Sequence, residues 1–489
     1  MDFKYLRNMR VIRFCQALSY MSLFFFLACQ GEVTKVQTTE GELQMNTDEL
    51  LQTIGEIYAY GYPLVLMDMT KRVTTNIETP HPTRPRAPIN QLGHFREFPD
   101  HTLTAVVKPN VDTYYSIAWL DLGKGPQVLS MPATERYYLL PFMDAYSNVF
   151  ASPGTRTTGT GAQCFLVAGP KWQGEAPAEC TLIQAPTEMV WMLGRIQVNS
   201  EEDGASVVKA IQDGMQLVPL SAFGDSTYTA PTGKVDPDFQ ETTPVKAIRQ
   251  LDINTYFNRL ADLMTQNPPA ARDSGIVRKM QKLGLTPGKP FSLSTDNLIV
   301  RTKLKALPSF LHKRMEQRRA EPDTTLLKNG WSIATDGIGE YGTEYLRRAF
   351  INFIALGANL PEDAVYPNLV YDINGDPLEG KYRYQIHFEA DQLPAVNAFW
   401  SLTVYNADEF LVENEFNRFA LGDRDQLAYN EDGSLDLYIQ STPPAMNQRA
   451  NWLPAPQEGQ FFLTLRLYWP KPEVLAGDWL PPPVIPVRE

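Results

Sequence analysis

Two loops in the first half of the chain carry carboxylates that could act as an acid–base pair. Asp112 follows Asn110 between two apolar runs, and Asp144 precedes Tyr146 and Asn148 after another apolar run. A protonated carboxyl group and an ionised one on either side of a bond can catalyse hydrolysis of a saccharide or a related small molecule. Asp112 and Asp144 are therefore candidate catalytic residues of a hydrolase-like enzyme.

Polar and aromatic side chains in both halves of the chain could instead bind a ligand without reacting with it. The candidate ligand-binding residues are Asn110, Tyr115, Tyr146, Asn148, Arg156, Trp400 and Arg418. Arginine binds anions and tryptophan stacks on sugar rings, so this set predicts a small molecule or a saccharide as the ligand. The same residue types also cap turns, pair within loops and fill cores, and those structural roles stay open.

Other signatures of catalysis are missing from the sequence. Gly337, Gly339 and Gly342 have the spacing of a dinucleotide fingerprint, but no apolar strand precedes them and no βαβ unit follows. The five histidines lack the i, i+2 or i, i+4 spacing of a zinc site, and no G-x-S-x-G motif occurs. We therefore expect no cofactor and no metal centre, and we favour a binding protein over the alternative of an enzyme.

The first 29 residues have the pattern of a lipoprotein signal peptide. Basic residues lead into Ala17–Ala28, an apolar run that is too short to span a bilayer. The sequence Phe26-Leu27-Ala28-Cys29 resembles a lipobox, in which the cysteine is lipidated. This pattern predicts an exported protein of the cell envelope, periplasmic or outer-membrane, that is attached to a membrane through Cys29. Secretion without a lipid and an uncleaved N-terminal anchor are the alternatives.

The charge of the chain excludes nucleic acid as a partner. The formal net charge is −12, and no basic stripe interrupts the acidic sequence. Since an acidic surface repels phosphate backbones, we expect the partners to be a small molecule or saccharide and, through the lipid, a membrane. A homo-oligomer stays open.

Two cysteines remain after Cys29, namely Cys164 and Cys180. In an oxidising compartment they can form a disulfide, and closing a loop of this length is worth roughly 3 kcal/mol of stability. The alternative is a pair of small buried apolar side chains.

Strands are the main elements that must position these residues. A helix is expected over Asp48–Thr75, and short runs rich in valine, tyrosine, leucine and phenylalanine follow from Leu103 to Ile196. Turn residues separate these runs, and this pattern predicts an antiparallel sandwich rather than a parallel sheet with crossover helices. Helical periodicity then dominates until strands return at Val365. The sequence thus predicts a mainly β protein with helical segments.

Several sequence blocks resemble the two-domain family DUF1254 and DUF1214. The blocks are Pro109–Ser116, Asp144–Phe150, Gly154–Thr160, Gly339–Thr343, Asn397–Tyr405, Asn417–Arg424 and Asn451–Pro456. The resemblance implies an Ig-like β-sandwich, a helical insert and a C-terminal jelly-roll-like β-sandwich, and it assigns no activity. The expected domains are a signal peptide at 1–29, a tether at 30–48, a DUF1254-like helix plus β-sandwich at 49–199, a helical linking region at 200–358 and a DUF1214-like β-sandwich at 359–489.

Overall fold

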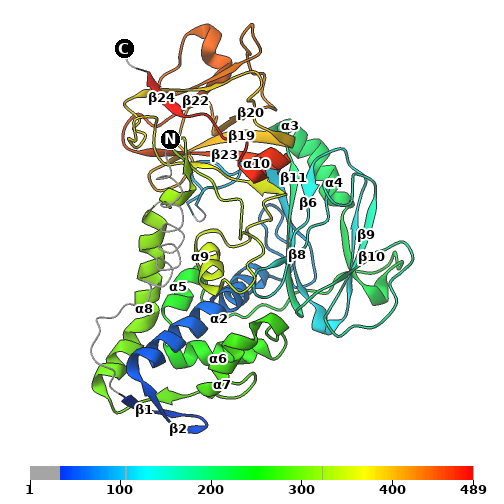
Figure 1. Ribbon diagram of the computed structural model, residues 1–489. Helices are drawn as coiled ribbons and strands as arrows, with labels where there is room; N and C mark the ends of the chain where they lie inside the picture. Colours follow the sequence, from blue (N-terminus) through cyan, green and yellow to red (C-terminus); the bar gives the residue numbers. More distant parts are fainter. Residues whose placement is uncertain (1–32, 105–106, 322, 488–489) are drawn as a thin grey trace, which may run out of the picture. The chain divides into compact units, whose positions relative to one another are not determined.

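The computed structural model describes residues 33–104, 107–321 and 323–487 (Figure 1). The expected signal peptide and its lipidation site, Cys29, lie outside these residues. None of the described helices combines the length and the apolar composition that crossing a bilayer requires. The described chain is mainly β, with several sheets and a helical insert, and this confirms the expected fold class.

Two compact units make up the described chain. A helical unit comprises residues 33–69, 242–321 and 343–354, and a β unit comprises residues 70–241, 323–342 and 355–487. The first long helix therefore belongs to the helical unit up to Met69. Residues 200–241, which the sequence assigned to the helical linking region, belong to the β unit. These borders differ from the expected ones because packing joins segments that are distant in the sequence.

The helical unit contains one long buried helix, α2 (Thr47–Thr75). Asn46 caps its start, because Oδ1 of Asn46 accepts hydrogen bonds from the backbone N–H groups of Asp48 (2.9 Å) and Glu49 (3.3 Å). Most side chains between positions 50 and 68 are buried, as expected for a helix that is apolar on all sides. The other helices of this unit are α5 (Pro244–Arg249), α6 (Ile253–Met264), α7 (Ser274–Lys282), α8 (Leu298–Ala320) and α9 (Tyr345–Ala355).

A β hairpin occupies most of the segment that the sequence predicts to be a tether. Strand β1 (Val33–Thr38) pairs antiparallel with β2 (Gly41–Asn46), and its other edge pairs with β13 (Leu293–Ser294). Val36 and Met45 are 1% and 4% exposed, so alternate side chains of the hairpin are buried. The segment is therefore a folded part of the helical unit and not a free tether.

A buried histidine lies among the aromatic residues of the helical unit. His312 on α8 is 0% exposed, and its Nε2 atom lies 3.1 Å from the hydroxyl of Tyr58 on α2. The ring of Tyr58 stacks on that of Tyr256 on α6, with 4.1 Å between the ring centroids. Burial, with a smaller effect of Arg249, lowers the pKa of His312 to about 4. The imidazole is therefore neutral in the folded protein at physiological pH.

We expect this histidine to make the protein less stable in acid. Because its pKa is lower in the folded state than in the unfolded state, the unfolded state takes up the proton first as the pH falls below 6.5. At about 1.4 kcal/mol per pKa unit, the contribution of His312 falls by about 3 kcal/mol between pH 7 and pH 4. Urea denaturation of wild type and His312→Gln across this range should show the stability difference between them shrinking. Curves that stay parallel would contradict the prediction.

The first sandwich of the β unit consists of two sheets that face each other across an apolar core. One sheet contains, in spatial order, β10 (Thr181–Gln184), β9 (Gln163–Ala168), β5 (Gln127–Met131) and β12 (Gln216–Pro219). The other contains β3 (Gly93–Phe95), β4 (Thr113–Asp121), β11 (Met189–Gln197), β7 (Phe142–Met143) and β8 (Val149–Ala151), with β6 (Tyr138–Leu139) also paired to β11. The short helices α3 (Glu201–Asp203) and α4 (Lys209–Gly214) precede β12.

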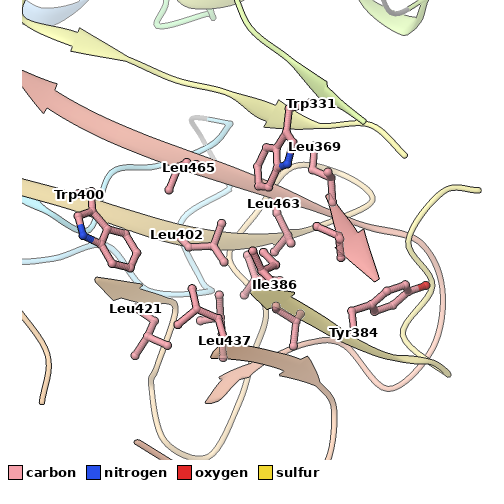
Figure 2. Close-up of a cluster of buried hydrophobic side chains, with 14 of the residues drawn as sticks. Trp331, Leu369, Tyr384, Ile386, Trp400, Leu402, Leu421, Leu437, Leu463 and Leu465 are labelled. Atoms are coloured by element: carbon pink, nitrogen blue, oxygen red, sulfur yellow. The ribbon is translucent and has the colours of Figure 1, made fainter. Parts of the chain in front are cut away.

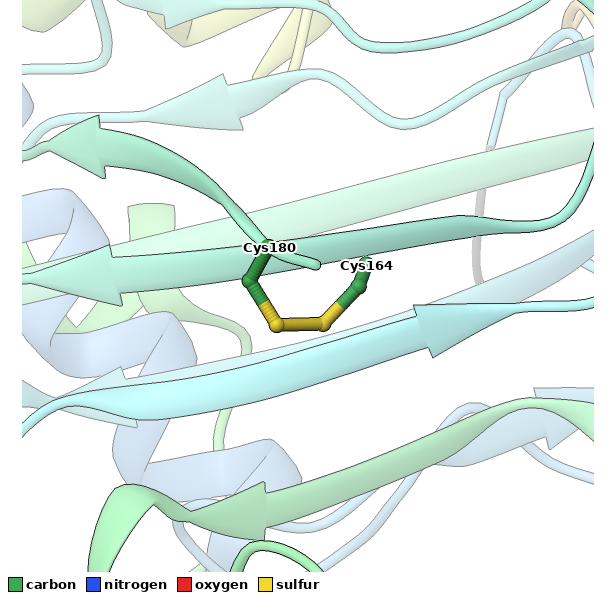
Figure 3. The surroundings of a disulfide bond; sticks show 2 residues. All are labelled: Cys164 and Cys180. Atoms are coloured by element: carbon green, nitrogen blue, oxygen red, sulfur yellow. A yellow bond between two sulfur atoms is a disulfide. The ribbon is translucent and has the colours of Figure 1, made fainter. Parts of the chain in front are cut away.

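A disulfide joins the two cysteines of this sandwich. Cys164 lies in β9, and Cys180 immediately precedes β10, with 4.4 Å between their Cα atoms (Figure 3). The parallel ladder of β9 and β10 begins one residue further on, where Phe165 lies opposite Thr181. The bond therefore fixes the register at the start of a parallel pair on the edge of the sheet.

The second sandwich again has two sheets. The first contains β14 (Leu327–Lys328), β15 (Trp331–Ser332), β17 (Asn368–Leu369), β23 (Phe461–Pro470), β19 (Val396–Asn406) and β20 (Ala420–Gly422), with β16 (Ala364–Val365) also paired to β23. The second contains β22 (Trp452–Pro454), β21 (Leu435–Gln440), β18 (Arg383–Phe388) and β24 (Val484–Val487), and the helix α10 (Pro472–Ala476) follows β23. Leucines from both sheets meet around Trp331 and Trp400 in the core (Figure 2).

Candidate functional site

Strands β19 and β23 alternate apolar and polar side chains, yet both faces of their sheet are buried. The apolar side chains that point into the sandwich core include Leu463, Leu465 and Leu467. On the opposite face, Arg466 is 6% exposed, and Ser401 and Tyr468 are 0% exposed. Arg466 lies directly opposite Ser401 in the β19–β23 ladder. A polar face of an antiparallel sheet ordinarily meets water, whereas this one meets residues of the first sandwich.

Asp112 is the residue of the first sandwich at the centre of this contact. Asn110 holds the backbone in front of Asp112, because Oδ1 of Asn110 accepts a hydrogen bond from the backbone N–H of Asp112 at 2.7 Å. The Asp112 carboxylate is 0% exposed and accepts hydrogen bonds from Ser401 (2.7 Å) and Tyr468 (3.3 Å). Its other oxygen forms an ion pair with Arg424. A carboxylate so enclosed is suited to act as a structural counter-ion and not as an acid or base for a substrate.

Asp144, the other candidate acid–base residue, holds a turn. Its Oδ1 atom accepts hydrogen bonds from the backbone N–H groups of Tyr146 (2.8 Å) and Asn148 (2.9 Å), between which Ser147 has a φ of 65°. The Asn148 side chain donates to the second oxygen at 2.9 Å. Neither Asp112 nor Asp144 lines either of two surface hollows, of about 360 and 730 Å³. These contacts give no support to a shared acid–base site.

Three other candidate ligand residues have structural partners. Nε of Arg156 donates to the carboxylate of Asp363 at 2.7 Å. Trp400 is 4% exposed and fills the core of the second sandwich (Figure 2). Arg418 donates to backbone carbonyl groups, including that of Trp452 at 2.9 Å. These three side chains therefore stabilise loops and core, which is the structural role that their residue types left open.

Two further arginines lie close together beside the Asp112 contact. Arg195 on β11 lies opposite Tyr115 on β4, and its guanidinium carbon is 5.2 Å from the centre of the Tyr115 ring. The guanidinium carbon of Arg466 is 5.6 Å from the centre of the Tyr366 ring. Burial raises the pKa of Tyr366 to about 12, and the positive charges of Arg195 and Arg466 act in the opposite direction. Both guanidinium groups therefore act on one tyrosine. We call Arg195, Arg466, Tyr115 and Tyr366 the arginine cluster.

Positive charge exceeds negative charge in and around the arginine cluster. Arg195 is 7% exposed, and its partners are the hydroxyl of Tyr115 and the carbonyl oxygens of Leu193 and Gly357, none of which is a carboxylate. Arg466 shares Asp112 with Arg424, and its Nε atom, 3.8 Å from Asp112, is buried without a hydrogen-bond partner.

One more carboxyl group lies near, that of Asp423, whose Oδ1 atom accepts a hydrogen bond from the backbone N–H of Trp400 at 3.3 Å. Together with Asp112 it supplies at most two negative charges against three guanidinium groups, those of Arg195, Arg424 and Arg466. Tyr115 and Tyr366 keep part of their surface accessible, so the cluster is not sealed from solvent. This combination could hold an anion.

Of the arginine cluster, the sequence identified only Tyr115. Two signals in the sequence point to the arginines, since each is the only charged residue of its strand, Met189–Gln197 in one case and Phe461–Pro470 in the other. A charged residue in such a strand needs a partner if both faces of the sheet are buried. The sequence alone does not show that both faces are buried.

Two family models match the chain. DUF1254, described as a protein of unknown function, matches residues 89–219, and DUF1214, with the same description, matches residues 363–472. No curated protein matches the sequence significantly.

Two solved structures resemble the fold. The VPA0106 protein from Vibrio parahaemolyticus is 23% identical with a TM-score of 0.65, and the alignment covers 90% of this chain and 100% of that one. An uncharacterized protein from Burkholderia cenocepacia is 12% identical with a TM-score of 0.41, covering 90% and 95%. The first likeness concerns the fold alone. The chain therefore carries a DUF1254 match followed by a DUF1214 match, in the order that the sequence blocks indicate, and this confirms the two-domain pattern that those blocks resemble.

Proposed function

We propose that this is an exported, lipid-anchored protein of the cell envelope that binds a small anionic molecule at the arginine cluster. The ligand class that fits is a small carboxylate, including an acidic saccharide. The proposal keeps the binding role that the sequence favours. Of the seven candidate ligand-binding residues it retains only Tyr115, and it adds Arg195, Arg466 and Tyr366. The enzyme alternative loses its support, because both of its carboxylates are engaged in holding the fold.

The observation that carries the proposal is the buried guanidinium of Arg195, which among the described residues has no carboxylate partner. A buried charge is ordinarily paired, because removing it from water is costly. The carboxylate of a ligand would supply the missing counter-ion. The Nε of Arg466, which lacks a hydrogen-bond partner, would add a second donor, and the partly exposed residues Tyr115 and Tyr366 would contact the body of the ligand.

Export and anchoring are supported by different features. The basic and apolar segments that precede Cys29 have the order of a lipoprotein signal peptide. The disulfide between Cys164 and Cys180 suits an oxidising compartment outside the cytoplasm.

Titration calorimetry with succinate, citrate, glucuronate and phosphate would test the binding proposal. We expect at least one of the carboxylates to bind, and Arg195→Gln to weaken it by about 1.5–3 kcal/mol, or roughly 10-fold to 150-fold, because a charge-assisted hydrogen bond is lost. Arg195→Lys keeps the charge but loses the planar fork, and we expect an intermediate affinity.

Arg418→Gln is the matched control, since Arg418 also lies in the β unit and donates to backbone carbonyls away from the cluster. It should bind the anion as the wild type does. Equal affinities for wild type and Arg195→Gln, with both proteins folded by circular dichroism, would overturn the site. Consumption of an added compound, read by mass spectrometry, would reinstate the enzyme.

A further inference from the structure

Three large apolar side chains are exposed at one place in the helical unit. Val33 opens β1, and Leu298 and Ile299 open α8; they are 66%, 65% and 63% exposed. Among the exposed large hydrophobic side chains of the described residues, only Met446, at 77%, is more exposed. Scattered exposed apolar residues are ordinary, but three that meet need a reason.

Hydrogen bonds show that the start of α8 lies beside the start of β1. Gln37 and Ser294 are paired in the β1–β13 ladder. Beyond that pair, the hydroxyl of Thr295 donates to the carbonyl of Lys35 at 2.8 Å, and the side chain of Asn297 donates to the hydroxyl of Thr34 at 3.2 Å. The chain therefore runs back along β1 toward Val33 before α8 begins. In Figure 1 one end of α8 lies next to β1.

Basic side chains border this apolar patch. Arg301 and Lys305 follow Leu298 by three and seven residues, so all three share one face of α8, and both basic residues are exposed. Neither forms an ion pair with any described residue, and Asp296 is the exposed acidic residue nearby in the sequence. The three segments of the helical unit contain more lysine and arginine than aspartate and glutamate, although the chain as a whole has a net charge of −12.

We propose that Val33, Leu298, Ile299, Arg301 and Lys305 form a membrane-docking surface that rests on an anionic lipid bilayer. Apolar side chains with a basic border are the features by which a protein surface binds the lipid interface. The position of this surface in the chain favours a membrane as its partner. Cys29 precedes Val33 by four residues, a span of at most about 14 Å, so a lipid on Cys29 holds this surface at the bilayer.

The docking surface rests on the proposed lipid anchoring, which by itself would leave the orientation of the protein free. The basic patch adds an electrostatic attraction to anionic lipid, and this attraction acts on one face of the helical unit only. The surface would thus fix which face of the helical unit meets the membrane.

Tryptophan fluorescence would test the docking surface. The mature protein carrying Ile299→Trp would be purified with its native N-terminus and mixed with vesicles of phosphatidylcholine and phosphatidylglycerol, some containing lipids brominated on the acyl chains. We expect the brominated lipids to quench the added fluorescence of Ile299→Trp about twofold or more. Met446→Trp, at a position in the β unit that is 77% exposed against 63% for Ile299, is the control and should show no added quenching.

Charge reversal tests the basic border separately. Arg301→Glu and Lys305→Glu should each weaken partitioning into these vesicles by about fivefold or more, with no effect on pure phosphatidylcholine vesicles. Both positions are exposed on α8, so these variants should fold. Wild-type partitioning by both variants would overturn the proposal, and so would an unquenched Ile299→Trp on vesicles that bind the protein.

Two further outcomes are distinguishable. Mass spectrometry of the mature N-terminus reports lipidation directly, so an unmodified Cys29 would refute the anchor while the vesicle assay still tests the surface. A dimer in sedimentation that Leu298→Asp dissociates would show that the patch binds a second copy of the chain, and this result would overturn the membrane as its partner.

Discussion

Asp112→Asn is expected to lower the free energy of unfolding by about 3–5 kcal/mol. The substitution removes the carboxylate that the partly buried Arg424 and the buried Arg466 both face, and breaking a buried ion pair from one side costs this much. Asparagine also presents an N–H₂ group where Ser401 and Tyr468 now donate. Urea denaturation followed by far-ultraviolet circular dichroism would measure the loss.

The double variant Asp112→Leu/Arg424→Met is the companion experiment. Removing both partners together should restore part of the stability that Asp112→Asn loses, because no unpaired charge is left between this pair. Ser401→Ala removes one neutral donor and should cost about 1 kcal/mol. A loss below about 1 kcal/mol for Asp112→Asn would show that this carboxylate is not the counter-ion that the contacts indicate.

Trp331→Ala should also cost about 3–5 kcal/mol, the range for truncating a large buried side chain. Trp331 is 0% exposed in the core of the second sandwich (Figure 2). Its Nε1 atom donates to the carbonyl of Pro482 at 2.8 Å. It also attaches β15 to the sheet, opposite Leu369 of β17.

Two comparisons separate the contributions at Trp331. Trp331→Phe keeps most of the apolar volume and loses the hydrogen bond to Pro482, so we expect a smaller loss of about 1–3 kcal/mol. Tyr429→Ala, at a side chain that is 50% exposed, should change the unfolding free energy by no more than about 0.5 kcal/mol. Equal effects of Trp331→Ala and Tyr429→Ala in urea denaturation would contradict the packing shown here.

Local signals in the sequence were sufficient for most of the elements. The helix expected over Asp48–Thr75 begins one residue earlier in the structure, where Asn46 supplies the cap. Within the stretch of helical periodicity, residues 245–265 form two helices, α5 and α6, and not one. Asp252 separates them, because its carboxylate accepts a hydrogen bond from the N–H of Thr255 and starts a new helix. Such a cap can be read from the sequence, although helical periodicity continues across it.

Contacts between distant residues account for what the sequence did not show. The sequence drew attention to Asp112 and Asn110, but the hydroxyl that holds Asp112 comes from Ser401, 289 residues further on. Propensity and periodicity describe neighbours, and they cannot show which polar strand face will be covered. The sequence did not predict the hairpin at 33–46 for the same reason. The strand that pairs with its edge, β13, is more than 250 residues from β1 in the sequence.

The sheet of β19 and β23, buried on both faces, also bears on how such proteins can be divided. Cut from its companion, the DUF1214 region would present Arg466, Ser401 and Tyr468 to water, and the DUF1254 region would carry Asp112 without its partners. The regions 89–219 and 363–472 match separate family models, but we expect each to depend on the other for folding. Chimaeras that exchange one half between relatives should fail unless the residues around Asp112 are exchanged together.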